Sequence, residues 1–279
     1  MSETEAGLAE EELAELQWAH RHLEHPSLAA RLSSVIGDPI EQTLHLMPKS
    51  WYRRIDEVAE RSIRIMLDLT INGMAQISPD ASNDQLHSLL VMGTGAVSGF
   101  FGPALLLAEL PVTTALMLRS IADIAHSQGE DLNSEDAKVA CMQVFALGGR
   151  SKEDNATDTG YYGLRITLGL HFSHRILQIR PSSKMPIPAG INIARGIASR
   201  FGVAVSDKVA AQLVPVAGAV SGALLNLVFM NHFQDIAKGH FIVRRLERRH
   251  GAEKIRKAYE QFNQNEAETK RSFSPLEGW

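Results

Sequence analysis

The chain has 279 residues and one cysteine, and its 28 basic and 32 acidic side chains give a formal net charge of −4. One cysteine excludes a domain held together by internal disulfides, and an apolar share of 44 % with so small a net charge excludes a disordered chain. The overall charge also gives no reason to expect nucleic acid as a partner.

The N-terminal part is acidic and is predicted to be helical. Residues 1–16 contain six glutamates and no basic residue, and their leucines recur close to helical spacing. Pro26 ends this helix, because proline cannot continue it. Gly37-Asp38-Pro39 then marks the end of one helix and the start of a short one, which Pro48 closes. We therefore treat residues 1–48 as acidic N-terminal helices.

The rest of the chain is predicted to be a series of longer helices. Apolar residues near a 3.6-residue period predict a helix over 51–77, and Asn133 or Ser134 is a suitable cap for a helix that ends at Leu147. Further helices are expected at 104–127, with a kink at Pro111, and at about 161–178, 190–212 and 252–263. Another helix, which ends at His250, is expected before the last of these. No stretch alternates as a strand does. We predict an all-α fold of about eight to ten helices, with one domain over 49–263 and a loosely ordered tail over 264–279.

Two long segments carry no charged residue at all. They are residues 85–108 and 209–234, both rich in glycine and alanine, and each is long enough to cross a bilayer as a helix. Pro103 and Pro215 interrupt them, so neither is a clean membrane span. Two interpretations remain open: a central helix pair buried within a helical domain, or a hairpin that embeds in a membrane.

A basic segment follows the second uncharged segment. Residues 238–257 contain eight Lys and Arg against two Glu, a net charge of +6. A basic amphipathic helix of this kind is typical of proteins that bind anionic lipid. The alternative is a solvated helix face that pairs with the acidic N-terminal helix. The residues proposed to contact a lipid surface or a membrane-protein partner are Arg244, Arg245, Arg248, Arg249, Lys254, Arg256 and Lys257.

Polar side chains inside the apolar helices form the second set of candidates. Glu109 and Arg119 are expected to point inward from one helix, because a buried carboxylate needs a partner. The full set is Glu109, Thr113, Thr114, Arg119, Asn226, Asn231, His232, Asp235 and His240. Such a cluster is either a polar network that fixes helix register or a site for an ion, ligand or proton. Phosphate-loop and nucleophile-elbow patterns are absent, so we assign no catalytic residue, metal or cofactor.

The same segments carry a family resemblance. Residues 99–114 read GFFGPALLLAELPVTT, and residues 215–226 read PVAGAVSGALLN. With the residues that follow each run, they resemble the EcsC protein family over about residues 45–262. That family takes its name from a protein encoded beside the ATPase and membrane subunits of a bacterial ABC exporter. The resemblance implies a bacterial origin and a role at the membrane, and it assigns no catalytic residue.

Three functions are compatible with these patterns. The first is a non-enzymatic accessory protein of the bacterial cytoplasm that is peripheral at the inner face of the membrane, linked by the resemblance to an ABC-type transport system. The second is a hydrolase with a metal or acid–base site built from Glu109, His232, Asp235 and His240. The third is a soluble helical module that binds a partner's apolar helix between its own helices.

Overall fold

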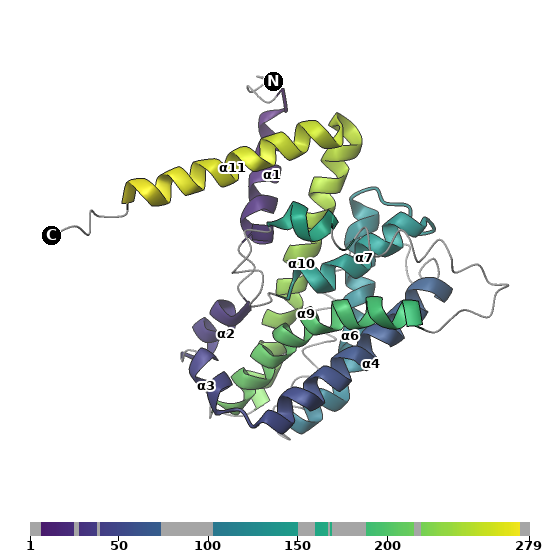
Figure 1. The fold of residues 1–279 in the computed structure, drawn as a ribbon, viewed down its shortest axis with the longest axis vertical. Coiled ribbons are helices and arrows are strands. Elements are labelled where there is room, and N and C mark those ends of the chain that lie inside the picture. The colour runs from purple at the N-terminus through teal and green to yellow at the C-terminus, as the bar shows by residue number, and fades with distance from the viewer. Residues whose placement is uncertain are drawn as a thin grey trace.

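The chain folds into packed α-helices, as a computed structural model shows (Figure 1). The structure describes residues 7–24, 28–37, 40–73, 103–149, 160–166, 168, 188–214 and 219–273. Within these residues there are nine helices of at least seven residues, no strand, and a short helix over 161–166. This confirms the all-α prediction. The helices are α1 (Glu10–Glu24), α2 (Leu28–Ile36), α3 (Ile40–Leu46), α4 (Lys49–Gly73), α6 (Pro103–Ser127), α7 (Glu135–Leu147), α9 (Pro188–Leu213), α10 (Ala219–His250) and α11 (Ala252–Phe273).

Local sequence signals explain most of the helix ends. The Ser134 hydroxyl accepts a hydrogen bond from the backbone N–H of Ala137 at 3.2 Å and so caps α7. Gly37 after α2 and Gly251 between α10 and α11 have φ values of 79° and 90°, a conformation that glycine adopts without strain. Pro111 lies inside α6, which continues through it.

The C-terminal part is more regular than the sequence analysis expected. Helix α11 continues to Phe273, whereas the prediction ended the helix at Asn263 and treated the following residues as a loosely ordered tail. Exposed ion pairs four residues apart stabilise a polar helix, and Arg256–Glu260 is one such pair in α11. The prediction gave too little weight to polar residues as helix formers.

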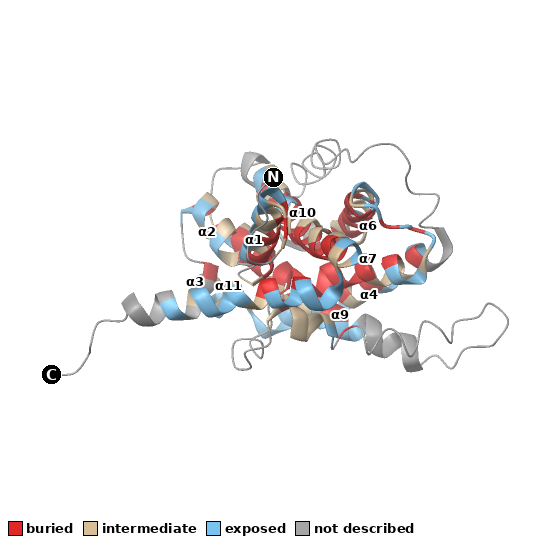
Figure 2. Ribbon diagram, turned by 90° about the horizontal axis from the view of Figure 1, so that it is seen from above, coloured by how far each residue is buried: buried red, intermediate tan, exposed pale blue. Residues whose placement is uncertain are grey.

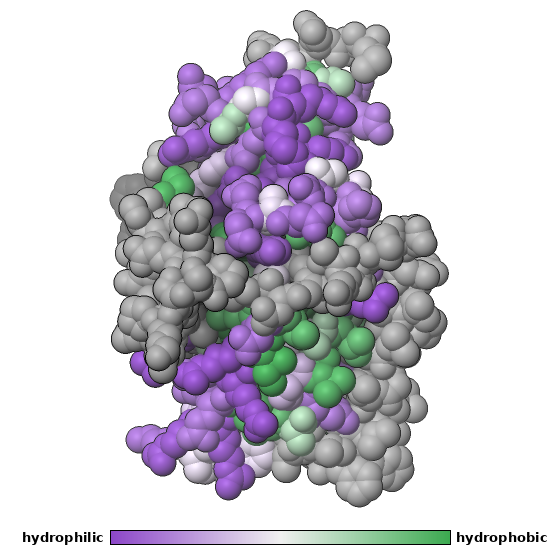
Figure 3. Space-filling model, turned by 90° about the vertical axis from the view of Figure 1, so that its right-hand side faces the viewer, coloured by the Kyte–Doolittle hydropathy of each residue, from purple (hydrophilic) through white to green (hydrophobic). Residues whose placement is uncertain are grey.

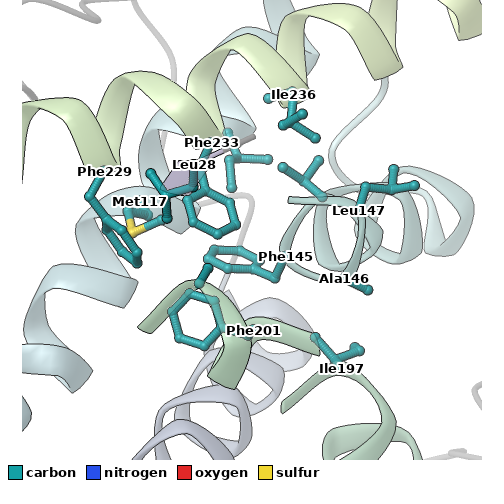
Figure 4. Close-up of a cluster of buried hydrophobic side chains, with 14 of the residues drawn as sticks. Leu28, Met117, Phe145, Ala146, Leu147, Ile197, Phe201, Phe229, Phe233 and Ile236 are labelled. Atoms are coloured by element: carbon teal, nitrogen blue, oxygen red, sulfur yellow. The ribbon is translucent and has the colours of Figure 1, made fainter. Parts of the chain in front are cut away.

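Helix α10 is the centre of the molecule. It packs against α1, α2, α6, α7, α9 and α11. Figure 2 shows buried residues where α10, α7 and α4 face the interior and exposed residues on the outer faces. A cluster of phenylalanines fills the contact between α7, α9 and α10, as Figure 4 shows. The ring centroids of Phe145 and Phe201 are 5.6 Å apart, and those of Phe229 and Phe233 are 5.2 Å apart. Such aromatic pairs add to the stabilisation that comes from buried area alone.

The end of α7 lies unusually close to α9. A side chain at Gly149 would place its Cβ 1.9 Å from the carbonyl oxygen of Arg200, a distance that no real Cβ contact shows. At Gly148 the nearest atom would be in the ring of Phe233, at 2.5 Å. The absence of side chains at this glycine pair therefore allows α7, α9 and α10 to meet.

The directions of the helices define two ends of the molecule. Helices α6 and α10 run parallel, because the contacts Gln234–Ser120 and Arg244–Glu130 both join residues 114 apart. Helix α9 runs against α10, since Lys208 lies over Phe229 and Phe201 lies beside Phe233. Helix α4 also runs against α9, since Glu60 pairs with Arg195 and Asp56 lies beside Gly202. The starts of α4, α6 and α10 and the end of α9 consequently lie at one end, the lower end in Figure 1.

The two uncharged segments are described to different extents. Most of 85–108 lies outside the described residues, which begin again at Pro103. Of 209–234, the described part is packed against protein: Val209, Phe229 and Phe233 have no exposed surface. Within the described residues, no helix combines the length and the apolarity that crossing a membrane requires.

Candidate functional site

The polar candidates come from the packed faces of α6 and α10, but they do not all point inward. Thr113, Thr114, Asn226, His232 and His240 are buried, and Glu109 and Asp235 are half-buried. Arg119 and Asn231 are exposed. The expectation that Arg119 points inward beside Glu109 is wrong, because ten residues stop about 80° short of three full helical turns.

Three of the candidates on α10 have partners on three different elements. His232 donates from Nε2 to the carbonyl oxygen of Gly148 at 2.8 Å, at the end of α7. Asp235 accepts a hydrogen bond from Arg31 of α2 at 2.6 Å. The Nδ1 atom of His240 lies 2.9 Å from the Tyr161 hydroxyl. Each side chain joins α10 to a different neighbour.

Burial keeps both of these histidines neutral near pH 7. It lowers the pKa of His232 to about 4, and it lowers the pKa of His240 well below its ordinary value. Among the described residues, no group of three His, Cys, Asp or Glu side chains is arranged to hold a metal ion. The contacts of these histidines hold helices together, and those of His232, Asp235 and His240 lead to three different elements instead of into one site.

Glu109 has a charged neighbour that the sequence analysis missed. Lys208 of α9 is only 2 % exposed, and its Nζ lies 4.5 Å from the centre of the Phe229 ring. Burial lowers the pKa of Lys208 to about 7, and the charge of Glu109 opposes that shift. The signal available in the sequence was the single lysine of α9, which follows Asp207 between two apolar runs. It was missed because nothing local shows that Lys208 faces inward.

The basic segment is paired with acidic groups along most of its length. Arg244 of α10 donates to Glu130 at 2.7 Å and to Asp136 at 2.6 Å, and Arg248 also contacts Glu130. Arg244 and Glu130 are both nearly buried, so their pairing holds the loop before α7 against α10.

The acidic N-terminal helix supplies partners for three more basic residues of α10. Glu15 of α1 pairs with Arg245, and Glu12 pairs with Arg249 and His250. Hydrogen bonds from His250 and Arg249 lower the pKa of Glu12 to about 2. The expected pairing with the acidic helix is therefore present for Arg245, Arg249 and His250, whereas Arg244 and Arg248 pair with Glu130 and Asp136. Lys254, Arg256 and Lys257 of α11 remain exposed.

A second ion-pair cluster, also missed from the sequence, attaches the short helix 161–166 to α10. Arg165 donates to both carboxylate oxygens of Glu247, at 2.9 and 2.7 Å, and the Tyr162 hydroxyl donates to the same group at 3.0 Å. Burial raises the pKa of Tyr161 to about 12. The fixed fork of an arginine suits this two-point contact with a carboxylate.

Comparison with known proteins identifies the family. The model of the EcsC protein family matches residues 10–246, which is most of the chain. The chain belongs to the EcsC protein family. No curated protein and no solved structure matches it. The match begins at the first residue of α1, so it includes the N-terminal helices that the sequence analysis had left outside the resemblance.

The lower end of this EcsC-family protein carries exposed apolar side chains. Leu46 at the end of α3 is 82 % exposed, and Leu213 at the end of α9 and Leu224 in the second turn of α10 are each 39 % exposed. Tyr52 of α4 is exposed as well. Figure 3 shows another face, the right-hand side of Figure 1, where hydrophilic residues cover the upper part and hydrophobic and hydrophilic residues lie side by side in the lower part.

The upper half contains a shallow cavity between α1, α6 and α10. Its volume is about 480 Å³, and its lining includes Trp18, Ile124 and Ile242 together with Glu11, Glu15 and Lys238. Glu15 is paired with Arg245, and Lys238 also has a partner. These pairings leave an open hollow whose walls are mainly apolar.

Proposed function

We propose that this EcsC-family protein is a non-enzymatic accessory protein that docks peripherally on the inner face of the bacterial membrane. The observation that carries the proposal is the set of exposed leucines at the lower end, Leu46, Leu213 and Leu224. Helix α6, whose first six residues belong to the uncharged segment 85–108, begins at this same end. Leu69, Val112 and Ile166 are exposed at other places on the described surface, so the proposal depends on the position of the three leucines at one end. Apolar surface that is concentrated in one region is typical of sites that bind a membrane or another protein.

The size of the apolar contribution fits reversible docking. Complete burial of a leucine side chain contributes about 1.5–3 kcal/mol, and two of the three leucines are already more than half buried. Together they would supply roughly 3–5 kcal/mol. A single apolar anchor of this strength gives only marginal membrane binding, and stable attachment needs a second contribution such as charge.

The family resemblance suggests a partner within the membrane. We propose that the lower end meets the membrane subunits of an ABC-type transport system, as the protein that gives the family its name is encoded beside such subunits. Native bacterial membranes and protein-free lipid vesicles separate the two forms of docking. Binding to native membranes alone would indicate a protein partner, and binding to both would indicate lipid.

The experiment is vesicle flotation with the wild type, a triple variant and a control variant. The triple variant Leu46→Ser, Leu213→Ser and Leu224→Ser removes the exposed leucines, and we expect it to lose most of the bound fraction. Ile166→Ser is the matched control, because Ile166 is 47 % exposed but lies on the short helix beside α10. If all of the wild-type protein stays unbound, with vesicles and with native membranes alike, the proposal is contradicted. Equal loss in the control would contradict the choice of surface.

A further inference from the structure

The start of α4 holds three exposed cations beside the exposed leucine of α3. Lys49, Arg53 and Arg54 are all exposed and lie within the first two turns of the helix. Leu46, three residues before Lys49, is 82 % exposed. Tyr52 lies between the cations, and its hydroxyl donates to the carbonyl oxygen of Leu44 at 2.7 Å, which fixes the corner between α3 and α4.

These cations differ from those of α10 in having no acidic partner. Within the described part of the chain, none of the three forms an ion pair. The first turn of α4 contains no acidic residue, but the exposed Asp56 and Glu57 follow within one turn of Arg53 and Arg54, so carboxylates border the three cations on one side. Glu60, further along the helix, is already paired with Arg64 and Arg195.

The arginines of α10, by contrast, would have to break existing contacts before binding another anion. Arg244, Arg245, Arg248 and Arg249 each contact a carboxylate of α1, of the loop before α7 or of α7 itself. Removing one partner of a nearly buried ion pair such as Arg244–Glu130 is strongly unfavourable. Among the described residues, three cations without an acidic partner therefore lie at the apolar end of the molecule, whereas in the basic segment only the exposed lysines of α11, Lys254 and Lys257, lack one.

We infer that the corner between α3 and α4 binds the headgroups of anionic phospholipids through Lys49, Arg53 and Arg54, while Leu46 enters the apolar layer beneath them. This rests on the proposed membrane docking and names the lipid that it selects. Apolar, aromatic and cationic side chains side by side are the combination that suits the boundary between headgroups and acyl chains. The attraction between these cations and anionic headgroups supplies the second contribution to binding, which stable docking by the leucines requires.

The size of the effect follows from the number of cations. Each basic residue near an anionic surface contributes about 1 kcal/mol, which corresponds to about a fivefold change in affinity. Removing all three should weaken binding to anionic vesicles by roughly a hundredfold at moderate salt. Binding to neutral vesicles should stay unchanged, because only the apolar contribution acts there.

The test compares two triple variants that remove the same charge. Lys49→Gln, Arg53→Gln and Arg54→Gln change the corner of α3 and α4, and Lys254→Gln, Arg256→Gln and Lys257→Gln remove three exposed cations from α11. Both variants are first checked by thermal unfolding. Affinity is then measured for vesicles of phosphatidylcholine alone and of phosphatidylcholine with phosphatidylglycerol. We expect the first variant to lose about a hundredfold on the anionic vesicles and the second less than about threefold.

The outcomes separate this inference from the proposed function. Equal affinity of the wild type for both kinds of vesicle leaves the docking intact and overturns the selection of anionic lipid. Equal losses in the two variants, or a larger loss in the α11 variant, overturn the assignment to α4. No binding of the wild type to either vesicle overturns the inference, and the comparison with native membranes then decides whether docking itself survives.

Discussion

Lys208 should make the stability of this protein depend on pH near neutrality. Burial between α9 and α10 lowers its pKa from 10.5 to about 7. In the unfolded chain the lysine keeps its ordinary pKa, so between about pH 7 and 10.5 the unfolded state holds a proton that the folded state lacks. Stability consequently rises with pH across this window, and the full penalty of burying the charge is felt below about pH 7.

The substitution Lys208→Met removes this dependence while filling a similar volume. Each pH unit within the window corresponds to about 1.4 kcal/mol. From about pH 7 to about pH 9 the wild type should gain up to about 3 kcal/mol in its free energy of unfolding relative to the variant. The variant should also be the more stable of the two at about pH 6, because a thioether is buried at a lower cost than an ammonium group.

Urea denaturation at several pH values between about 6 and 9 measures this difference. Lys257→Met is the matched control, because Lys257 is exposed on α11 and its removal should leave the pH dependence of the wild type unchanged. The buried tyrosines, with pKa values raised from 10, act only at higher pH. Parallel stability curves for the wild type and Lys208→Met would refute the assignment of a depressed pKa to Lys208.

Three further predictions concern the contacts that hold the helices together. Glu130→Gln should lower the free energy of unfolding by about 3 kcal/mol, because it weakens the nearly buried ion pair with Arg244. Glu135→Gln weakens an exposed pair and should lower that free energy by no more than about 0.5 kcal/mol. Urea denaturation measures both. Glu12→Gln should reduce the acid sensitivity of the protein, because the wild type loses stability as the pH falls from 4.5 towards about 2 and Glu12 takes up a proton. Circular dichroism measures the acid transition, and a transition that is the same in both proteins would contradict the pairing of Glu12. Gly149→Ala should destabilise by about 3 kcal/mol or more, since its Cβ meets the backbone of α9, whereas Gly196→Ala has open space and should stabilise by about 0.5–1 kcal/mol in thermal unfolding.

The fold class could be predicted because helical signals are local. The serine cap of α7 and the glycine after α2 lie within a few residues of the helix ends that they determine. The error at α11 has a local cause too, because that helix is polar and only part of one side of it packs on the protein. A prediction based on apolar periodicity therefore ended the helix too early, whereas the helix propensities of its polar residues favour a longer helix.

The candidate site was predicted less well, because inward orientation over ten residues depends on small differences of helical angle. The buried candidates of α6 and α10 were identified correctly as buried, but Arg119 and Asn231 lie on the outer faces. His232, Asp235 and His240 were predicted to belong to one site. A helix in the centre of a bundle has neighbours on every side, so groups on α10 that are close in sequence contact different helices.

The sequence by itself determined the helical character, the family and the unequal distribution of charge, because each depends on residues that are neighbours along the chain. Only the tertiary structure decided which charges are neutralised. Glu15 and Arg245 are 230 residues apart, and Glu12 and Arg249 are 237 apart, so no local pattern reveals that they meet. Packing of α1 on α10 pairs the basic segment with acid, while the cations at the start of α4 face solvent beside the exposed Leu46. An ion pair depends on distance in space, and folding alone sets that distance.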